Sequence, residues 1–261
     1  MGEWMNEKMV NERMNILITN DDGWGTKGIA TLVRLMLPLG HVYVVAPEGP
    51  RSGYAASITV QHPMYLTRVE NPGEGMEQAE VYVTNGTPAD CIKLALNVLF
   101  DSDERKIDLL VSGINHGSNA SINVIYSGTM GACLVAAEHG IPAIGYSYCD
   151  HAPDIDLTEA EKYIPEITRH LLEEQMPYGV CYNVNFPVGA VEGIQWTRQC
   201  RAHWQKEMLA HQDEQGRTYY TLVGDFVNHE PDAEDTDEYA LAHHRISICP
   251  TSIDLTAYQM L

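Results

Sequence analysis

The stretch Met14-Asn-Ile-Leu-Ile-Thr-Asn-Asp-Asp-Gly23 decides the fold. Its first six residues are mostly apolar, as in a strand buried on both faces of a parallel sheet, and Asn20–Gly23 is a polar turn. Residues 28–39 then carry apolar side chains at helical spacing, and Gly40 is expected to end this helix as a C′ glycine. Residues 41–46 form a second apolar run. The sequence therefore predicts a strand–helix–strand unit with a polar loop after its first strand.

The same alternation continues along the chain. We expect strands at 81–84, 108–112, 141–145 and 180–187, and helices at 89–100, 128–138 and 157–174. This order predicts an α/β fold, a Rossmann-like and mostly parallel sheet with helices on both faces, as a catalytic domain over 14–187. Residues 188–261 contain strand-like pieces at 219–223 and 245–248. They predict a smaller C-terminal appendage of strands and an extended arm, which is not an independent domain.

Composition excludes several classes of partner. The 261 residues are 44% hydrophobic and carry a formal net charge of −20. Polymeric nucleic acid and anionic membranes are bound by clustered Lys and Arg, so neither is an expected partner. The six cysteines are scattered without a CxxC pair, which indicates reduced, buried thiols. Residues 1–13 lack the apolar centre of a signal peptide, and together these features predict a cytoplasmic protein.

Four predicted strands end in polar loops, and ligands of open α/β sheets bind beyond the carboxyl ends of the strands. Two adjacent carboxylates, Asp21 and Asp22, repel each other unless one is protonated or a cation lies between them. The pair favours a divalent metal over a helix cap beside a solvated acid. Ser52 and Asn115 are the natural neutral oxygen ligands in the neighbouring loops. Oxygen-only ligands suit Mg²⁺, Mn²⁺ or Ca²⁺ rather than zinc.

A second candidate element is the start of the helix near residue 128. Tyr126–Gly131 is rich in small and hydroxyl residues, and amides and hydroxyls at a helix N-terminus bind anions. Ser127, Gly128 and Thr129 are therefore candidate phosphate contacts, with an ordinary helix cap as the alternative. Neither a Walker sequence nor a GxGxxG turn is present, which disfavours triphosphate and dinucleotide sites.

Taken together, the motifs resemble the SurE (survival protein E) family of metal-dependent nucleoside monophosphate phosphatases, the 5′/3′-nucleotidases. The matching stretches are Asn20–Gly23 with Gly28-Ile29, Val45–Pro47 with Arg51–Gly53 and Ser57–Thr59, Asn85–Asp90, Ser112–Asn115 with Gly117 and Asn119, Tyr126–Thr129 and Asn183–Pro187. The resemblance implies one divalent metal ion per subunit, Mg²⁺ or Mn²⁺, with Asp21, Asp22, Ser52 and Asn115 as ligands. It also implies phosphate contacts at Asn119 and at Ser127–Thr129, catalytic roles for Asp21 and Asp22, and a homodimer or homotetramer that exchanges C-terminal segments.

The predicted function is hydrolysis of nucleoside monophosphates to nucleoside and phosphate. Either attack by metal-activated water or an aspartyl-phosphate intermediate fits the residues. The alternatives are a nucleotide-sugar-dependent transferase and a non-enzymatic, acidic Ca²⁺-binding module. Thr26-Lys27 stands where the family commonly has Ala-Pro, which places an extra cation beside the expected metal. His116 lies at a variable family position and receives no role.

Overall fold

A computed structural model describes residues 13–102, 105–152 and 154–260. Within these ranges the central sheet has nine strands in the order β3-β4-β2-β1-β5-β6-β7-β13-β8. The strands are β1 Met14–Thr19, β2 Gly40–Pro47, β3 Leu66–Val69, β4 Glu80–Thr84, β5 Leu109–His116, β6 Ala143–Tyr148, β7 Val180–Phe186, β8 Gly193–Trp196 and β13 Arg245–Ser252. The six strands from β4 to β7 in this order are parallel, whereas β3 and β13 run antiparallel to their neighbours β4 and β7.

The connections create one switch point in the sheet. From β1 the chain moves to β2 and then β4 on one side, and it later returns to place β5 on the other side of β1. Loops that leave β1 and β5 therefore diverge over opposite faces. A crevice for ligands forms at such a point in doubly wound sheets.

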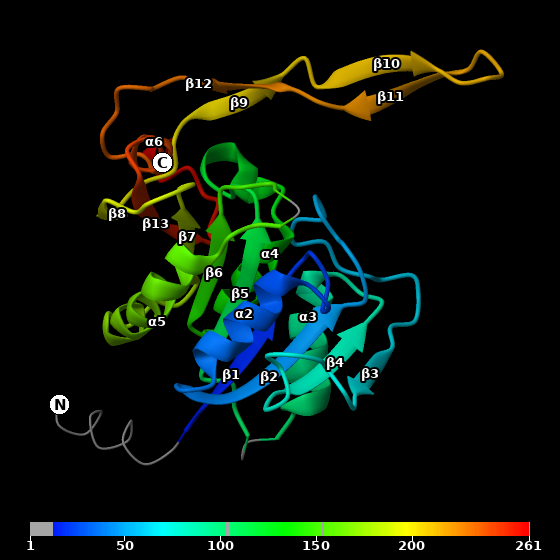
Figure 1. Ribbon diagram of the computed structural model, residues 1–261, viewed down its shortest axis with the longest axis vertical. Helices are drawn as coiled ribbons and strands as arrows, with labels where there is room; N and C mark the ends of the chain where they lie inside the picture. Colours follow the sequence, from blue (N-terminus) through cyan, green and yellow to red (C-terminus); the bar gives the residue numbers. More distant parts are fainter. Residues whose placement is uncertain (1–12, 103–104, 153, 261) are drawn as a thin grey trace.

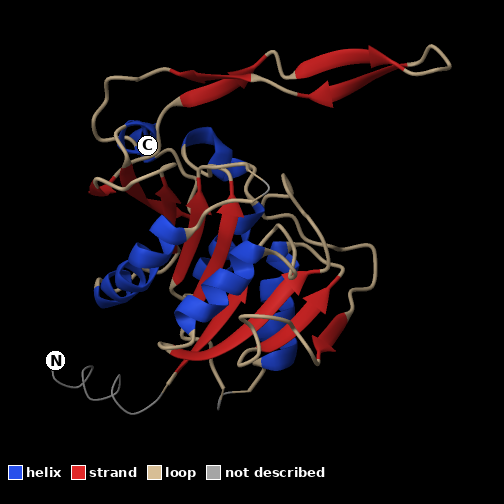
Figure 2. Ribbon diagram, in the orientation of Figure 1, coloured by secondary structure: helices blue, strands red, loops and turns tan. Residues whose placement is uncertain are grey.

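Helices cover both faces of this sheet, which confirms the predicted fold class (Figures 1 and 2). Helices α2 (Lys27–Met36) and α5 (Thr158–Glu173) pack with Ile16 and Ile18 in one core, and α3 (Pro88–Leu94) and α4 (Gly128–Glu138) pack with Leu17 in the other. Successive residues of β1 thus point to opposite faces. This explains why the strand appears apolar throughout in the sequence.

Two helix predictions need correction. The helix predicted over 28–39 ends at Met36, and Gly40 begins β2 instead of forming a C′ cap. A Cβ at Gly40 would lie 2.2 Å from the carbonyl oxygen of Met14, so the glycine permits close approach to β1. The helix predicted over 89–100 is α3 followed by the π-helix η1 (Ala95–Leu99), and the Thr87 side chain caps α3.

The strand predicted to end at residue 112 continues to His116, with a register shift against β6 between Ser112 and Asn115. The sequence pattern failed here because the polar residues of this segment resemble a loop. A 3-10 helix, η2 (Ser121–Ile125), follows it. The longer strand carries Asn115 to the end of β5 itself.

Beyond Phe186 the chain divides between the sheet and a projecting ribbon. β8 and β13 extend the main sheet, and helix α6 (Asp237–Ala242) precedes β13. The remaining strands, β9 (Ala202–Gln205) with β12 (Asp225–Asn228) and β10 (Met208–Gln212) with β11 (Thr218–Leu222), form a two-stranded ribbon. In Figure 1 this ribbon extends away from the body, as expected for an arm.

All six cysteines are free and five are buried, in agreement with the sequence. In the ranges described, no helix combines the length and apolar character needed to cross a membrane. The prediction that no signal peptide occupies the N-terminus falls on residues 1–12, outside the described part of the chain.

Candidate active site

The carboxyl ends of β1 and β5 meet at the switch point, where Thr19 pairs with Ser112. The side chain of Asn20 holds the turn after β1: it donates to the carbonyl of Gly23 at 2.9 Å and accepts from the Gly23 amide at 3.2 Å. Gly23 has a φ of +104°, which is the turn expected from the sequence. Asp21 and Asp22 are thus presented by a turn that is closed at both ends.

Asp21 is buried against the start of α4. Its Oδ1 accepts a 2.6 Å hydrogen bond from Oγ1 of Thr129. A Cβ at Gly128 would lie 2.7 Å from the Cβ of Asp21, so this glycine lets the helix approach the carboxylate. Burial raises the pKa of Asp21 to about 6, and repulsion by Asp22 adds to the shift, while the Thr129 hydroxyl and the Gly128 amide oppose it.

Asp22 lies on the other side of the turn, beside His116. Burial raises its pKa, against the His116 ring and backbone amide, which favour the charged form. Its Oδ2 is buried without a hydrogen-bond partner. Among the described residues neither Asp21 nor Asp22 forms an ion pair with lysine or arginine. Two carboxylates desolvated in this way without lysine or arginine meet the condition that a bound cation satisfies.

The two neutral candidates come from adjacent loops. The amide of Arg51 donates to the carbonyl of Asp21 at 2.6 Å, which brings the exposed Ser52 to the same edge. The side-chain amide of Asn115 donates to the Gly117 carbonyl at 2.8 Å, and this leaves its Oδ1 as an acceptor. No group of three or more His, Cys, Asp or Glu side chains in the described ranges is arranged to hold a metal. Neutral oxygens would have to complete the shell, and the donor set suits a hard divalent cation.

The candidate phosphate contacts divide into two groups. Ser127 caps α4, accepting from the Met130 amide at 3.0 Å, and the Thr129 hydroxyl is directed to Asp21. Asn119 is buried, and its side-chain amide donates to Oγ of Ser147 at 2.8 Å. The start of α4 therefore lies directly beside Asp21, whereas the side-chain amide of Asn119 is bound to Ser147 of β6.

Two asparagines that the sequence grouped with the motifs hold this loop in place. The side chain of Asn183 donates to the backbone carbonyl of Asn119 at 2.8 Å, and Oδ1 of Asn185 accepts from the backbone amide of Asn119 at 2.9 Å. Asn185 also donates to Oδ1 of Asn183 at 2.8 Å. The residues alternate on β7 and so share one face of the sheet. Their role was missed in the sequence, although two asparagines at a spacing of two within an apolar strand were the available signal.

Lys27, the extra cation expected from the sequence, forms no ion pair with Asp21 or Asp22 among the described residues. Its Nζ donates to the carbonyl of Ile155 at 2.6 Å, in the loop between β6 and α5. The departure at Thr26-Lys27 therefore ties α2 to that loop. The ring Nε2 of His116 is buried without a hydrogen-bond partner.

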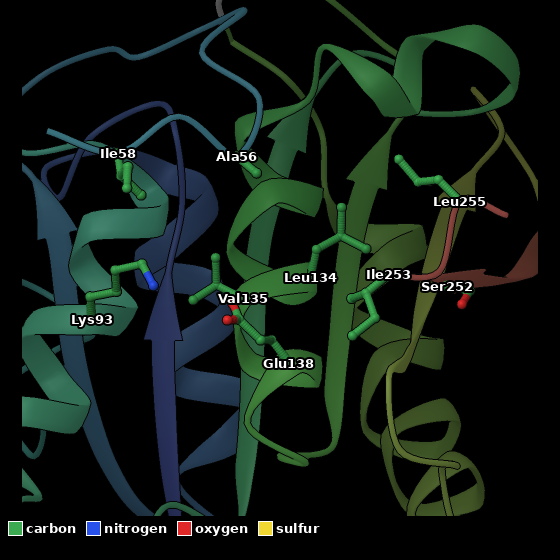
Figure 3. Close-up of a pocket in the computed structure, with 9 residues that line it drawn as sticks. All are labelled: Ala56, Ile58, Lys93, Leu134, Val135, Glu138, Ser252, Ile253 and Leu255. Carbon is green, nitrogen blue, oxygen red and sulfur yellow. The ribbon is translucent and has the colours of Figure 1, made fainter. Parts of the chain in front are cut away.

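A separate cavity of about 480 Å³ lies between α3, α4 and the segment after β13. Figure 3 shows its mostly apolar lining, which includes Ile58, Leu134, Ile253 and Leu255 with Lys93 and Glu138 at its sides. It does not contain the acid pair or any of the other predicted ligands. The acid pair lies outside this cavity, in the turn that follows β1 at the switch point.

The sheet and its acid pair define a doubly wound α/β protein with an acidic site at the carboxyl ends of β1 and β5. Residues 16–206 match the family model described as "Survival protein SurE", and the chain belongs to this family. It is 42% identical to "5′-nucleotidase SurE" of Phocaeicola vulgatus, over 97% of this chain and 96% of that protein. It is 45% identical to "5′-nucleotidase SurE" of Christiangramia forsetii, over 94% of both chains.

The fold comparison agrees with the family assignment. The crystal structure of the SurE protein from Aquifex aeolicus has a TM-score of 0.79 to this chain at 30% identity, over 95% of this chain and 96% of that one. The resemblance noted from the sequence motifs is thereby confirmed.

Proposed function

We propose that the chain is a metal-dependent phosphomonoesterase, a 5′-nucleotidase that hydrolyses nucleoside monophosphates to nucleoside and phosphate. The observation that carries the proposal is the acid pair, a buried Asp21 and a half-buried Asp22, which forms no ion pair with lysine or arginine in the described ranges. The similarity to relatives named 5′-nucleotidase supports the same activity.

One divalent ion per subunit, Mg²⁺ or Mn²⁺, would be held by Asp21, Asp22, Ser52 and Asn115. Two carboxylates neutralise its charge, so a phosphate dianion meets no excess negative charge. When bound, the ion would polarise a phosphoryl oxygen and lower the pKa of a water molecule. Thr129 fixes the orientation of the Asp21 carboxylate, and His116 supports Asp22 from the end of β5.

The substrate phosphate is proposed to lie over the start of α4. The amides at Gly128 and Thr129 belong to the first turn of that helix, and such amides favour an anion. Gly128 keeps this surface free of a side chain. Asn119, held by Ser147, Asn183 and Asn185, supplies its remaining Oδ1 and the fixed loop around it.

We infer an assembly of two or four subunits built by the C-terminal segments. A two-stranded ribbon is marginally stable by itself in water, and the described ribbon exposes Met208, Tyr220 and Leu222 by more than 60% each. A second subunit would cover these side chains. We also infer a cytoplasmic location, because free and mostly buried thiols are typical of a reducing compartment.

The test is phosphate release from the purified chain with a panel of nucleoside monophosphates, before and after chelation and after addition of Mg²⁺ or Mn²⁺. We expect turnover that is lost with chelator and restored by either metal. Full activity after exhaustive chelation would contradict the metal site. Transfer from a sugar nucleotide without phosphate release, or calcium binding without turnover, would replace the proposed function.

A further inference from the structure

A second cavity, of about 450 Å³, lies under the ribbon. It is lined by residues of four segments, which are the loop after β5, the loop after β6, the ribbon and α6. The residues that matter here are Ser118, Asn123, His151, Trp204, Phe226 and Glu238. We call it the ribbon cavity.

A short stretch of chain joins the ribbon cavity to the candidate metal site. Asn115 bonds to the carbonyl of Gly117, and Ser118 already lines the cavity. The His151 ring packs against Gly117 so closely that a Cβ there would lie 2.2 Å from its Cε1. Three residues span at most about 10 Å, so Ser118 lies within reach of a nucleotide whose phosphate is held beside Asn115.

Two aromatic rings form the upper wall. Trp204 of β9 and Phe226 of β12 meet edge to face, with ring centroids 5.4 Å apart. The indole Nε1 of Trp204 donates to Oδ1 of Asn123 at 2.8 Å, which fixes the ring relative to η2. Flat aromatic surfaces of this kind bind nucleobases by stacking.

The lower wall carries one carboxylate that the protein leaves without a donor. Burial and the neighbouring Asp237 raise the pKa of Glu238, and no hydrogen bond to its carboxylate opposes this. Asp237 is different, because its two oxygens accept from the backbone amides of Ser121 and Cys200 at 2.7 and 2.9 Å. Cys149 and His151 are the other titratable groups that line the cavity. Glu238 is thus the acceptor available to a ligand.

We propose that the ribbon cavity binds the base of the substrate nucleotide, with Glu238 selecting bases that present N–H donors. The inference rests on the proposed nucleotidase function. A carboxylate accepts two parallel hydrogen bonds from adjacent N–H groups, as on the pairing edge of guanine. Uracil instead presents one N–H between two carbonyl oxygens, which a carboxylate repels. The predicted order is guanosine monophosphate above uridine monophosphate.

The experiment compares kcat/KM for guanosine, adenosine, cytidine and uridine monophosphates with that for ribose 5-phosphate, a phosphomonoester without a base. We expect E238Q to lower the ratio of guanosine to uridine monophosphate about tenfold, since glutamine keeps one acceptor oxygen but lacks the charge and the second acceptor. The matched control is E166Q, an exposed glutamate on α5, which should leave every ratio unchanged.

A second variant tests the aromatic wall independently. F226L should raise KM for all four nucleotides about tenfold with kcat unchanged, because stacking is lost for each base. Unchanged base ratios in E238Q together with unchanged KM values in F226L would overturn the proposal. Equal changes for ribose 5-phosphate and the nucleotides would also overturn it. Hydrolysis of ribose 5-phosphate by the wild-type chain keeps these failures distinct from a failure of the phosphatase function, in which no phosphomonoester would be turned over.

Discussion

Thr129 donates a 2.6 Å hydrogen bond from its hydroxyl to Oδ1 of Asp21, across 108 residues of sequence. The bond joins the turn after β1 to the first turn of α4, so it couples the proposed metal site to the proposed phosphate site. A hydroxyl that donates to a ligating carboxylate fixes its orientation and is a determinant of metal affinity.

The first prediction follows from this bond. T129V should weaken Mn²⁺ binding and lower kcat by about 10–100-fold, because the Asp21 carboxylate loses its donor. T129S retains the hydroxyl and should recover most of both. Metal titration calorimetry and phosphate release measure the two effects, and a T129V enzyme with wild-type metal affinity would show that the bond has no such role.

The acid pair gives the second prediction. D21N and D22N should each lower kcat by at least about 100-fold, since each removes a charge that the cation needs. Bound metal, measured by elemental analysis after dialysis, should fall in parallel, and circular dichroism should show a folded chain. Wild-type turnover in either variant would place the site elsewhere.

The hydrogen bonds from Asn183 and Asn185 that hold Asn119, called here the Asn119 clamp, give the third prediction. N185L leaves the backbone amide of Asn119 without its acceptor and Oδ1 of Asn183 without its donor. Each buried polar group left unpaired costs about 1–3 kcal/mol. We expect the free energy of unfolding to fall by about 2–4 kcal/mol, as measured by urea titration. The control is N97L, which removes an exposed hydrogen bond from Asn97 of η1 to the carbonyl of Lys93. Its free energy of unfolding should change by about zero. Equal losses in the two variants would contradict the clamp.

Glu238 gives a prediction on pH. Its pKa is raised from 4.5 to about 7 by burial and by Asp237, so the folded state holds its proton more tightly than the unfolded state. Stability must then decrease as the pH rises from 4.5 to 7. E238Q removes this dependence and should be more stable than the wild type by about 1–3 kcal/mol above pH 7, with little difference near pH 4.5. Urea titrations at both pH values test it, and a difference that does not vary with pH would refute the assignment.

Assembly gives the last prediction. Gln205 pairs with Asp225, so residues 206–224 can be replaced by Asn-Gly, which closes a two-residue hairpin and retains Trp204 and Phe226. We expect the wild type to sediment as a dimer or larger at micromolar concentration and the shortened chain to sediment as a smaller species. Replacing only the turn at 213–216 keeps β10 and β11 and is the control. A wild-type monomer would exclude assembly through the ribbon.

The sequence predicted most of the sheet because its central strands are apolar on both faces. Ile16, Leu17 and Ile18 are all fully buried, although they enter different cores. It failed where burial and polarity disagree, as in the segment from Gly113 to His116, and it missed the largely exposed strand β10. The strand-like piece predicted at 219–223 is β11, although that strand is exposed as well.

The candidate site was predicted in part for a similar reason. Adjacent acids after a buried strand are visible in a sequence, because the electrostatic cost of the pair is local. Contacts between distant segments are not visible in this way. Neither the bond from Thr129 to Asp21 nor the inward direction of the Asn119 amide follows from spacing, since each depends on how two layers pack.

Gly128 has a consequence for the ways in which this enzyme can be changed. With 2.7 Å between its missing Cβ and the Cβ of Asp21, even alanine would displace the acid or the helix. Point substitution at that position therefore offers no route to a new substrate. Directed evolution of specificity has to work on the ribbon and α6, which line the ribbon cavity and do not contain the acid pair. A library restricted to Trp204, Phe226 and Glu238 would sample changes in specificity.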